Sequence, residues 1–200
     1  MPVQHRAHIT VENILQAAEE LFIQHEYRHV TTTRIAKRVG VSVGSLYQYF
    51  PDKKAIAYAL VEATSSHAAR ALREEIYTDV NLPHSEAAHR AIRLVLRIYQ
   101  KHEFVLLRLA NEEPELRDWV LDLSLERLIS SAAKLFIEQR GGAKTIANID
   151  VVLFIIHNMI FESIRQFVLR KPATFTEDEL IEEISSCLLA YYRTKSLDLQ

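Results

Sequence analysis

Residues 31–54, TTTRIAKRVGVSVGSLYQYFPDKK, predict two short helices joined by a tight turn and followed at once by the start of a third. Thr32 or Thr33 is expected to cap the first helix, because a threonine hydroxyl can accept a hydrogen bond from the free N–H groups of a first turn. Gly40 stands where this helix should end, and glycine adopts the positive φ of a helix C-terminus without steric strain. This turn chemistry indicates a helix-turn-helix.

The second helix is expected to cover residues 43–50. Ser42 can cap its first turn, Pro51 ends it because proline cannot continue a helix, and Asp52 can cap the helix that follows. Apolar residues form only one narrow stripe along this helix, and the other faces carry small or hydrogen-bonding side chains. The stripe consists of Val43, Leu46 and Phe50, and the other faces carry Gly44, Ser45, Tyr47, Gln48 and Tyr49.

Such a helix suits DNA. A recognition helix in a major groove places its N-terminal residues on base edges, and small residues there allow a close approach. Gln48 can bond an adenine with two hydrogen bonds, whereas serine and tyrosine hydroxyls suit phosphates or bases. The alternative is that the tyrosines pack against neighbouring helices. The complete series of caps, glycines and hydroxyl groups in this order favours DNA.

These residues resemble the DNA-binding module of TetR-type (tetracycline-repressor-like) transcriptional regulators. The resemblance covers about a quarter of the chain and is carried by residues 31–33, 35–36, 39–42, 44–47, 49–50 and 53. It implies phosphate contacts by Thr32, Tyr47, Tyr49 and Lys53, and base contacts by Val43, Gly44, Ser45 and Gln48. Pro51 departs from the more usual lysine or arginine, which removes one charge.

The composition is that of a soluble, largely helical protein. Of 200 residues, 48% are hydrophobic and 25% are charged, and only four are glycine and five are proline. The single Cys187 excludes an intrachain disulfide and fits a reducing compartment. The first ten residues are polar, and the longest apolar run, residues 151–156, is far shorter than the ~20 residues that span a bilayer. A cytoplasmic protein is expected.

The charge is unevenly distributed. The chain carries a net charge of −2, but its first 54 residues hold seven basic and five acidic side chains and the remainder is net acidic. Because DNA affinity depends on local neutralisation of phosphates, a basic N-terminal part on an acidic body is compatible with DNA binding.

Periodicity predicts an all-α protein of about nine helices. The first helix is expected from Thr10 to about His25, preceded by a mobile arm at residues 1–8. After the helix-turn-helix, helices are expected at residues 53–77, 85–101, 104–110, 115–139 and 148–169, and a last one after a capping box at residues 176–179. We expect an N-terminal three-helix DNA-binding domain at residues 1–52 and a larger effector-binding and dimerisation domain at residues 53–200.

The helix at residues 148–169 is apolar almost all round and must be buried on every side. We interpret it and the last helix as pairing with their copies across a two-fold axis, with a purely intrachain core as the alternative. The expected interface residues are Phe154, Phe161, Ile164, Ile184, Leu188 and Tyr191. A homodimer would present two recognition helices to a palindromic double-stranded operator.

The resemblance also implies a small-molecule pocket in the larger domain. Polar or amphipathic residues on apolar helices are its candidates: His67, Tyr99, Trp119, His157 and Asn158. The last two interrupt the most apolar helix and are the better candidates, whereas Trp119 has packing in the core as its alternative role. The many aliphatic and aromatic residues suggest an apolar or amphipathic effector.

Enzyme motifs are not evident. The nine histidines form no HExxH or Cys/His ligand spacing, no glycine-rich phosphate loop occurs, and Pro114 interrupts the acidic cluster at residues 111–115. We therefore expect no catalytic residue, metal site or cofactor. The prediction is a repressor released from DNA by an effector; the alternative is a helical small-molecule binder or enzyme whose helix-turn-helix mediates protein contacts.

Overall fold

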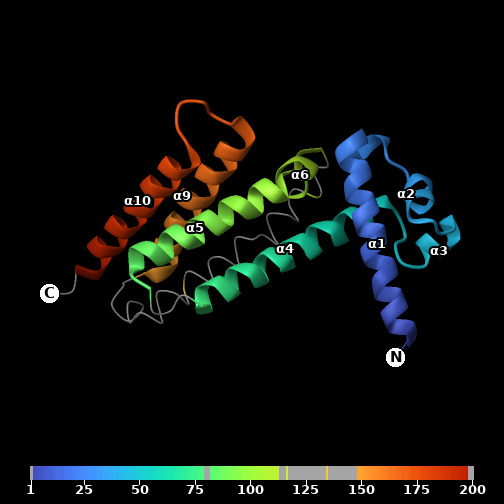
Figure 1. The fold of residues 1–200 in the computed structure, drawn as a ribbon, viewed down its shortest axis with the longest axis horizontal. Coiled ribbons are helices and arrows are strands. Elements are labelled where there is room, and N and C mark those ends of the chain that lie inside the picture. Colours follow the sequence, from blue (N-terminus) through green and yellow to red (C-terminus); the bar gives the residue numbers. More distant parts are fainter. Residues whose placement is uncertain (1, 79–81, 113–115, 117–133, 135–147, 198–200) are drawn as a thin grey trace. The chain divides into compact units, whose positions relative to one another are not determined.

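The computed structural model describes residues 2–78, 82–112, 116, 134 and 148–197, and every regular element in these residues is helical (Figure 1). The all-α prediction is confirmed. The chain packs as two compact units: unit 1 holds residues 1–64 and 104–122, and unit 2 holds residues 65–103 and 123–200. The helix expected at residues 115–139 and Trp119 lie almost entirely outside the described residues. The functional division expected after residue 52 stays a prediction.

Unit 1 begins with α1 (Pro2–His25), which starts well before the expected cap at Thr10. The predicted start is therefore wrong, and the residues expected to form an arm are helical from Pro2 onward. Proline is favoured at the first position of a helix, and neither glycine nor proline interrupts residues 3–26, so the helix continues to Pro2. A 3₁₀ turn, η1 (Tyr27–His29), follows before the next helix.

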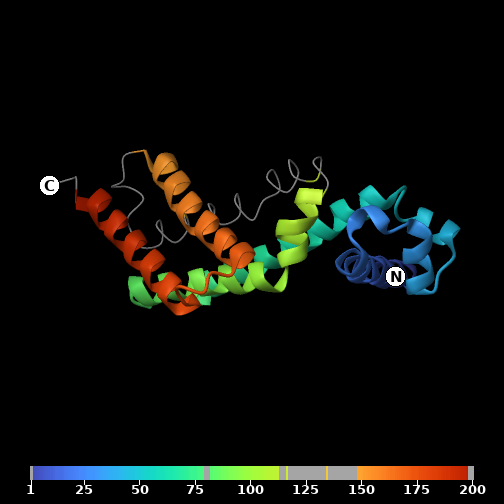
Figure 2. The same cartoon turned by 90° about the horizontal axis from the view of Figure 1, so that it is seen from above.

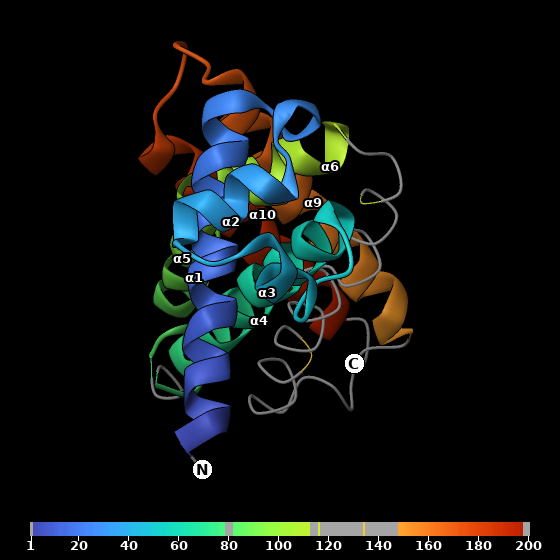
Figure 3. The ribbon, with the colours of Figure 1, turned by 90° about the vertical axis from the view of Figure 1, so that its right-hand side faces the viewer.

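The helix-turn-helix consists of α2 (Thr32–Val39) and α3 (Val43–Tyr47), seen together with α1 in Figure 3. Thr31 caps α2, because its extended backbone aims its hydroxyl at Arg34 N, 3.2 Å away, whereas Thr32 is already helical. The expected caps at Thr32 or Thr33 are thus wrong by one or two residues. Gly40 ends α2 at a φ of 82°, which confirms the predicted turn.

Helix α3 is shorter than predicted and ends before Phe50. The backbone N–H groups of both Tyr49 and Phe50 donate to Leu46 O at 3.0 Å, so the chain tightens and leaves the helix before Pro51. Asp52 Oδ1 then accepts from Ala55 N at 2.7 Å and caps α4 (Lys53–Thr78), as expected. Helix α4 starts in unit 1 and ends in unit 2.

The core of unit 1 draws on residues far apart in the sequence. After α5 (His84–Lys101), the chain enters unit 1 through a π-helix, η2 (Phe104–Arg108), and a short α6 (Leu109–Glu112). Side chains of this segment join those of the helix-turn-helix and of the first turns of α4, so the small N-terminal bundle gains apolar partners from two places. The core includes Ile14, Leu21, Phe22, Ile35, Leu46, Phe50, Ile56, Leu60, Val61, Val105, Leu109 and Leu116.

In unit 2, α5 (His84–Lys101) contacts both α9 (Ile149–Arg170) and α10 (Glu177–Leu197), as Figure 2 shows. The predicted capping box at the start of α10 is confirmed. Thr176 Oγ1 accepts from Glu179 N at 3.2 Å, and Glu179 Oε2 accepts from Thr176 N at 2.7 Å.

Helix α9 buries one side and exposes the other. Its inner side includes Val152, Ile156, Phe161 and Ile164, whereas Val151, Phe154 and Ile155 are 49%, 67% and 42% exposed. The helix is long and apolar enough to cross a membrane, with a mean hydropathy of 1.4, but the core helix of a soluble protein meets the same criterion.

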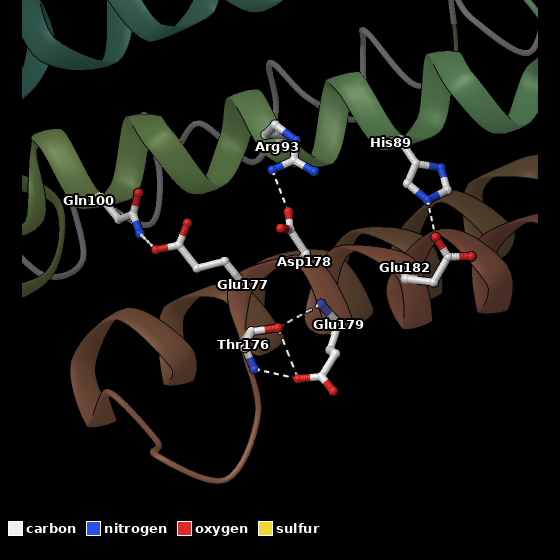
Figure 4. Close-up of polar contacts among 8 residues, drawn as sticks. All are labelled: His89, Arg93, Gln100, Thr176, Glu177, Asp178, Glu179 and Glu182. Carbon is white, nitrogen blue, oxygen red and sulfur yellow. Dashed lines mark hydrogen bonds and ion pairs between the residues drawn. The ribbon is translucent and has the colours of Figure 1, made fainter.

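Three polar contacts line the α5–α10 seam, which we define as His89–Glu182, Arg93–Asp178 and Gln100–Glu177 (Figure 4). They join one face of α5 to the first two turns of α10, and all three lie at the surface. Polar contacts this exposed each contribute little to the free energy of unfolding. The seam therefore fixes the register of the two helices more than it stabilises them.

The seam is expected to weaken as the pH rises. His89 Nδ1 faces Ser85 O and Nε2 faces Glu182, both at 2.7 Å, so only the protonated ring can donate to both. These bonds raise the pKa of His89 above its ordinary 6.5, against burial and nearby Arg93. A pKa raised by folding adds stability that is complete below the unfolded value and lost as the pH rises through the folded value. We expect the free energy of unfolding to fall by less than about 1 kcal/mol as the pH rises through the pKa of His89.

Urea unfolding on both sides of this pKa measures the effect. The difference in unfolding free energy between the two pH values should be smaller in His89→Gln than in the unchanged chain, because the substituted chain lacks the bonds that the protonated His89 ring donates. Equal pH dependence of the two proteins would contradict the prediction.

Candidate DNA-binding surface

The short helix α3 is held by its cap and one buried side chain. Ser42 Oγ accepts from Ser45 N at 3.0 Å, and the hydroxyls of these two serines lie 2.8 Å apart. Leu46 is fully buried against unit 1. The predicted cap at Ser42 is confirmed. Leu46 and half-buried Val43 face the core, and Gly44 and Tyr47 are exposed.

The outward faces carry hydrogen-bonding groups. Tyr47 and Tyr49 are 49% and 37% exposed, and Gln48 is exposed between them. At Gly44 an added Cβ would meet only Ser42 Oγ at 3.8 Å, so the start of the helix is open to close approach. Of the other predicted base-contacting residues, Val43 and Ser45 are half-buried. The alternative to a DNA role was that the tyrosines pack against neighbouring helices, but neither tyrosine is buried in this chain.

One hydroxyl group of α2 and one of α3 lie within hydrogen-bond distance of each other at the surface. Thr32 Oγ1 and Tyr47 OH lie 3.0 Å apart, so two of the expected phosphate-contacting residues meet in one place. Two adjacent hydroxyls can donate to neighbouring oxygens of one phosphate. Contacts of all these residues with DNA stay predictions.

Arginines of α2 also face α1. Arg38 Nη2 donates to Glu20 Oε2 at 2.6 Å, and this bond lowers the pKa of Glu20. Arg34 Nη2 lies 2.6 Å from His25 Nε2. Both bonds run between α1 and α2 and fix the angle at which α2 carries α3.

Lys53 occupies a different environment from the one its expected role suggests. Its ammonium donates to Tyr27 O at 2.7 Å and lies 4.1 Å from the centre of the Tyr27 ring. The ammonium carries three donors, so this bond does not exclude a phosphate. Sequence reasoning missed Tyr27 altogether, because an aromatic residue after a helix gives no local signal of such a contact.

The expected effector residues separate in the structure. Tyr99 and His157 are buried, and their ring centres lie 5.9 Å and 4.5 Å from that of Phe161. Asn158 is exposed, and its Nδ2 donates to Phe154 O in its own helix. His67 is exposed as well. Two of the four described candidates therefore come together, and their role stays a prediction.

The expected interface residues also divide. Phe154 is exposed, Leu188 and Tyr191 are half-buried, and Phe161, Ile164 and Ile184 are buried within unit 2. The chain alone therefore covers half of the predicted set, and the exposed side of α9 is the part that a second copy could still cover. Within the described residues, no three metal-ligating side chains cluster.

Comparison with known proteins agrees with this geometry. Residues 14–60 match the family model of bacterial regulatory proteins of the tetR family. The chain is 28% identical to the nucleoid occlusion factor SlmA of Vibrio cholerae over 173 residues, which cover 85% of this chain and 74% of that protein.

Solved structures share the fold over nearly the whole chain. A TetR-family transcriptional regulator of Mesorhizobium loti superposes with a TM-score of 0.73 and 16% identity, covering 94% of this chain and 98% of the other. FadR of Bacillus subtilis, in complex with stearoyl-CoA, gives a TM-score of 0.69 and 20% identity, covering 90% and 98%.

Proposed function

We propose that this chain, a DNA-binding transcriptional regulator of the tetR family, is a homodimeric repressor that an amphipathic effector releases from its operator. The observation that carries the proposal is α3, a capped helix with one buried leucine and an outward Tyr47, followed directly by outward Gln48 and Tyr49. A helix packed against protein would bury these side chains instead. DNA binding is assigned to residues 1–52, and effector binding and dimerisation to residues 53–200.

The roles on DNA follow from chemistry and exposure. Exposed Gln48 suits an adenine edge, open Gly44 allows α3 to approach the bases, and the paired hydroxyls of Thr32 and Tyr47 suit a phosphate. Two copies related by a two-fold axis would read half-sites ~34–36 Å apart. Such an operator would be palindromic.

The effector is proposed to be amphipathic. The buried aromatic group of Tyr99, His157 and Phe161 offers apolar surface with a hydroxyl and an imidazole. FadR of Bacillus subtilis holds stearoyl-CoA on the same fold, which makes long-chain acyl-CoA thioesters the first class to test. An effector with higher affinity for a conformation that DNA does not bind would weaken operator binding. We assign no catalytic role and no cofactor, and a cytoplasmic location.

A gel-shift assay with the DNA upstream of the protein's own gene tests the proposal. We expect retardation of that fragment but not of a scrambled fragment of equal composition, and release upon addition of stearoyl-CoA. Retardation without release would reject the acyl-CoA class alone. Absence of sequence-specific retardation would instead favour a helical binder or enzyme whose helix-turn-helix contacts protein.

Gln48→Ala is expected to relax sequence preference at one base pair of each half-site. Loss of a bidentate contact to an adenine costs about 1–3 kcal/mol of discrimination against the wrong base. Competition binding with operators substituted at each position measures this cost. Gln24→Ala, at an exposed position of α1, is the matched control and should leave preference unchanged. If Gln48→Ala weakened all sequences alike, the residue would not contact a base.

A further inference from the structure

The turn η1, which links α1 to α2, lacks a cap of its own. The first N–H groups of a helical turn have no partner inside the turn and need an acceptor. Glu26 precedes the turn but makes no capping bond; its backbone has a φ of 59°, and its carboxylate accepts from Arg28 Nε at 3.0 Å. The N–H of Tyr27 therefore needs an acceptor from elsewhere.

Glu112 supplies that acceptor from a position 85 residues later in the chain. Its Oε2 accepts from Tyr27 N at 2.8 Å. On the other side of the same residue, Tyr27 O accepts from Val30 N at 3.2 Å and from the Lys53 ammonium at 2.7 Å. Tyr27 is thus held by α6 through its N–H and by α4 through its carbonyl.

Tyr27, the residue held by these bonds, belongs to the core of unit 1. Tyr27 is 5% exposed, and its ring lies 5.1 Å from that of buried Phe22. The bond to Glu112 is part-buried, and Glu112 itself is exposed, so the Tyr27 N–H would lose its acceptor in a site that water reaches only in part, at a cost of about 1–3 kcal/mol. The bond to Glu112 is therefore selective for one arrangement of α1, η1 and α6.

The segment that carries Glu112 is firmly seated in unit 1. Val105 and Leu109 are fully buried in its core, beside Val61 of α4. The same segment follows Glu103, the last residue of this stretch of unit 2, without an intervening loop, and it starts as a π-helix. π-helical turns occur frequently at functional positions.

We infer that Glu112 is a positioning residue of the DNA-binding surface: its carboxylate caps η1 and so fixes where α2 and α3 lie relative to the start of α4. This inference rests on the proposed function. Because residues 104–112 follow α5 after only His102 and Glu103, they connect unit 2 to the DNA-binding helices along the chain by a second route besides α4. A change in unit 2 that withdraws Glu112 from Tyr27 would loosen the surface without touching any residue that contacts DNA.

Three substitutions separate the hydrogen bond from packing. Glu112→Ala removes the acceptor, Glu112→Met keeps the length of the side chain without the acceptor, and Glu112→Gln keeps an oxygen that can accept. Glu183→Ala, at an exposed position of α10, is the control for loss of one negative charge. Operator affinity is measured by fluorescence anisotropy at one salt concentration, well below the unfolding midpoint of every variant.

Alanine and methionine are expected to weaken operator binding about tenfold, the effect of ~1.4 kcal/mol, and to speed hydrogen exchange of the Tyr27 amide. Glutamine should restore most of the affinity and protection, and the Glu183 control should match the unchanged chain. Unchanged affinity in the alanine and methionine variants would overturn the inference, as would a glutamine variant as weak as alanine. If the unchanged chain bound no operator, the proposed function would fail, whereas amide exchange of Tyr27 would still test the cap.

Discussion

Replacement of Leu46 by alanine is expected to lower the free energy of unfolding of unit 1 by about 2–5 kcal/mol. Leu46 is the only buried residue of the five in α3 and is fully enclosed by the core of unit 1. A helix this short has no stability of its own, since isolated helices below ~12–15 residues are marginal in water. Half-buried Val43 packs against the same core, but Leu46 is the one fully buried anchor of α3, so the loss of its side chain should remove specific DNA binding as well.

Urea denaturation followed by circular dichroism, with operator binding in parallel, measures both effects. Leu46→Met is the matched control, because a swap that conserves volume costs less than about 1.5 kcal/mol and keeps the apolar anchor. Tyr47→Phe, one residue along the helix, tests the surface without the core, since the hydroxyl paired with Thr32 is lost and the ring remains. A Leu46→Ala protein with an unchanged unfolding midpoint would show that α3 is held by other contacts.

Local chemistry explains which parts of the fold the sequence predicted. The caps at Ser42 and Asp52, the positive φ at Gly40 and the capping box at Thr176 each involve residues no more than three or four apart. Such bonds are available to the chain before any tertiary structure forms. The cap at Thr31 shows the limit, since three consecutive threonines offer the same hydroxyl and only backbone geometry selects one.

Contacts between distant residues could not be predicted in this way. Nothing near Glu112 signals that its carboxylate bonds Tyr27, and nothing near Lys53 signals that its ammonium lies over the same ring. Helix α9 posed another difficulty, because an apolar pattern without periodicity does not say which side faces the core. The structure places Phe161 and Ile164 inside unit 2 and Phe154 outside it. The side of α9 that faces the core is the side that packs against α5.

Phe154→Glu is therefore expected to convert the proposed dimer into a monomer and to weaken operator binding by about 10²–10⁴-fold. Phe154 is 67% exposed, beside exposed Val151 and Ile155, so in a single copy its replacement removes little packing. In a dimer that covers this side of α9, the carboxylate would be buried without a partner, at a cost of about 3–5 kcal/mol in each copy that weakens dimerisation by several powers of ten. Separation of the two copies removes the second half-site contact and with it the avidity of paired binding.

Light scattering coupled to size-exclusion chromatography gives the mass of each variant, and circular dichroism shows whether the monomer stays folded. Phe175→Glu is the matched control, because Phe175 is an exposed phenylalanine of 41% exposure in the connection between α9 and α10. It should leave both mass and operator affinity unchanged. A Phe154→Glu protein that remained a dimer would place the interface elsewhere. Because Phe161, Ile164 and Ile184 are already buried in unit 2, the half-buried Leu188 and Tyr191 of α10 would then be the next residues to replace.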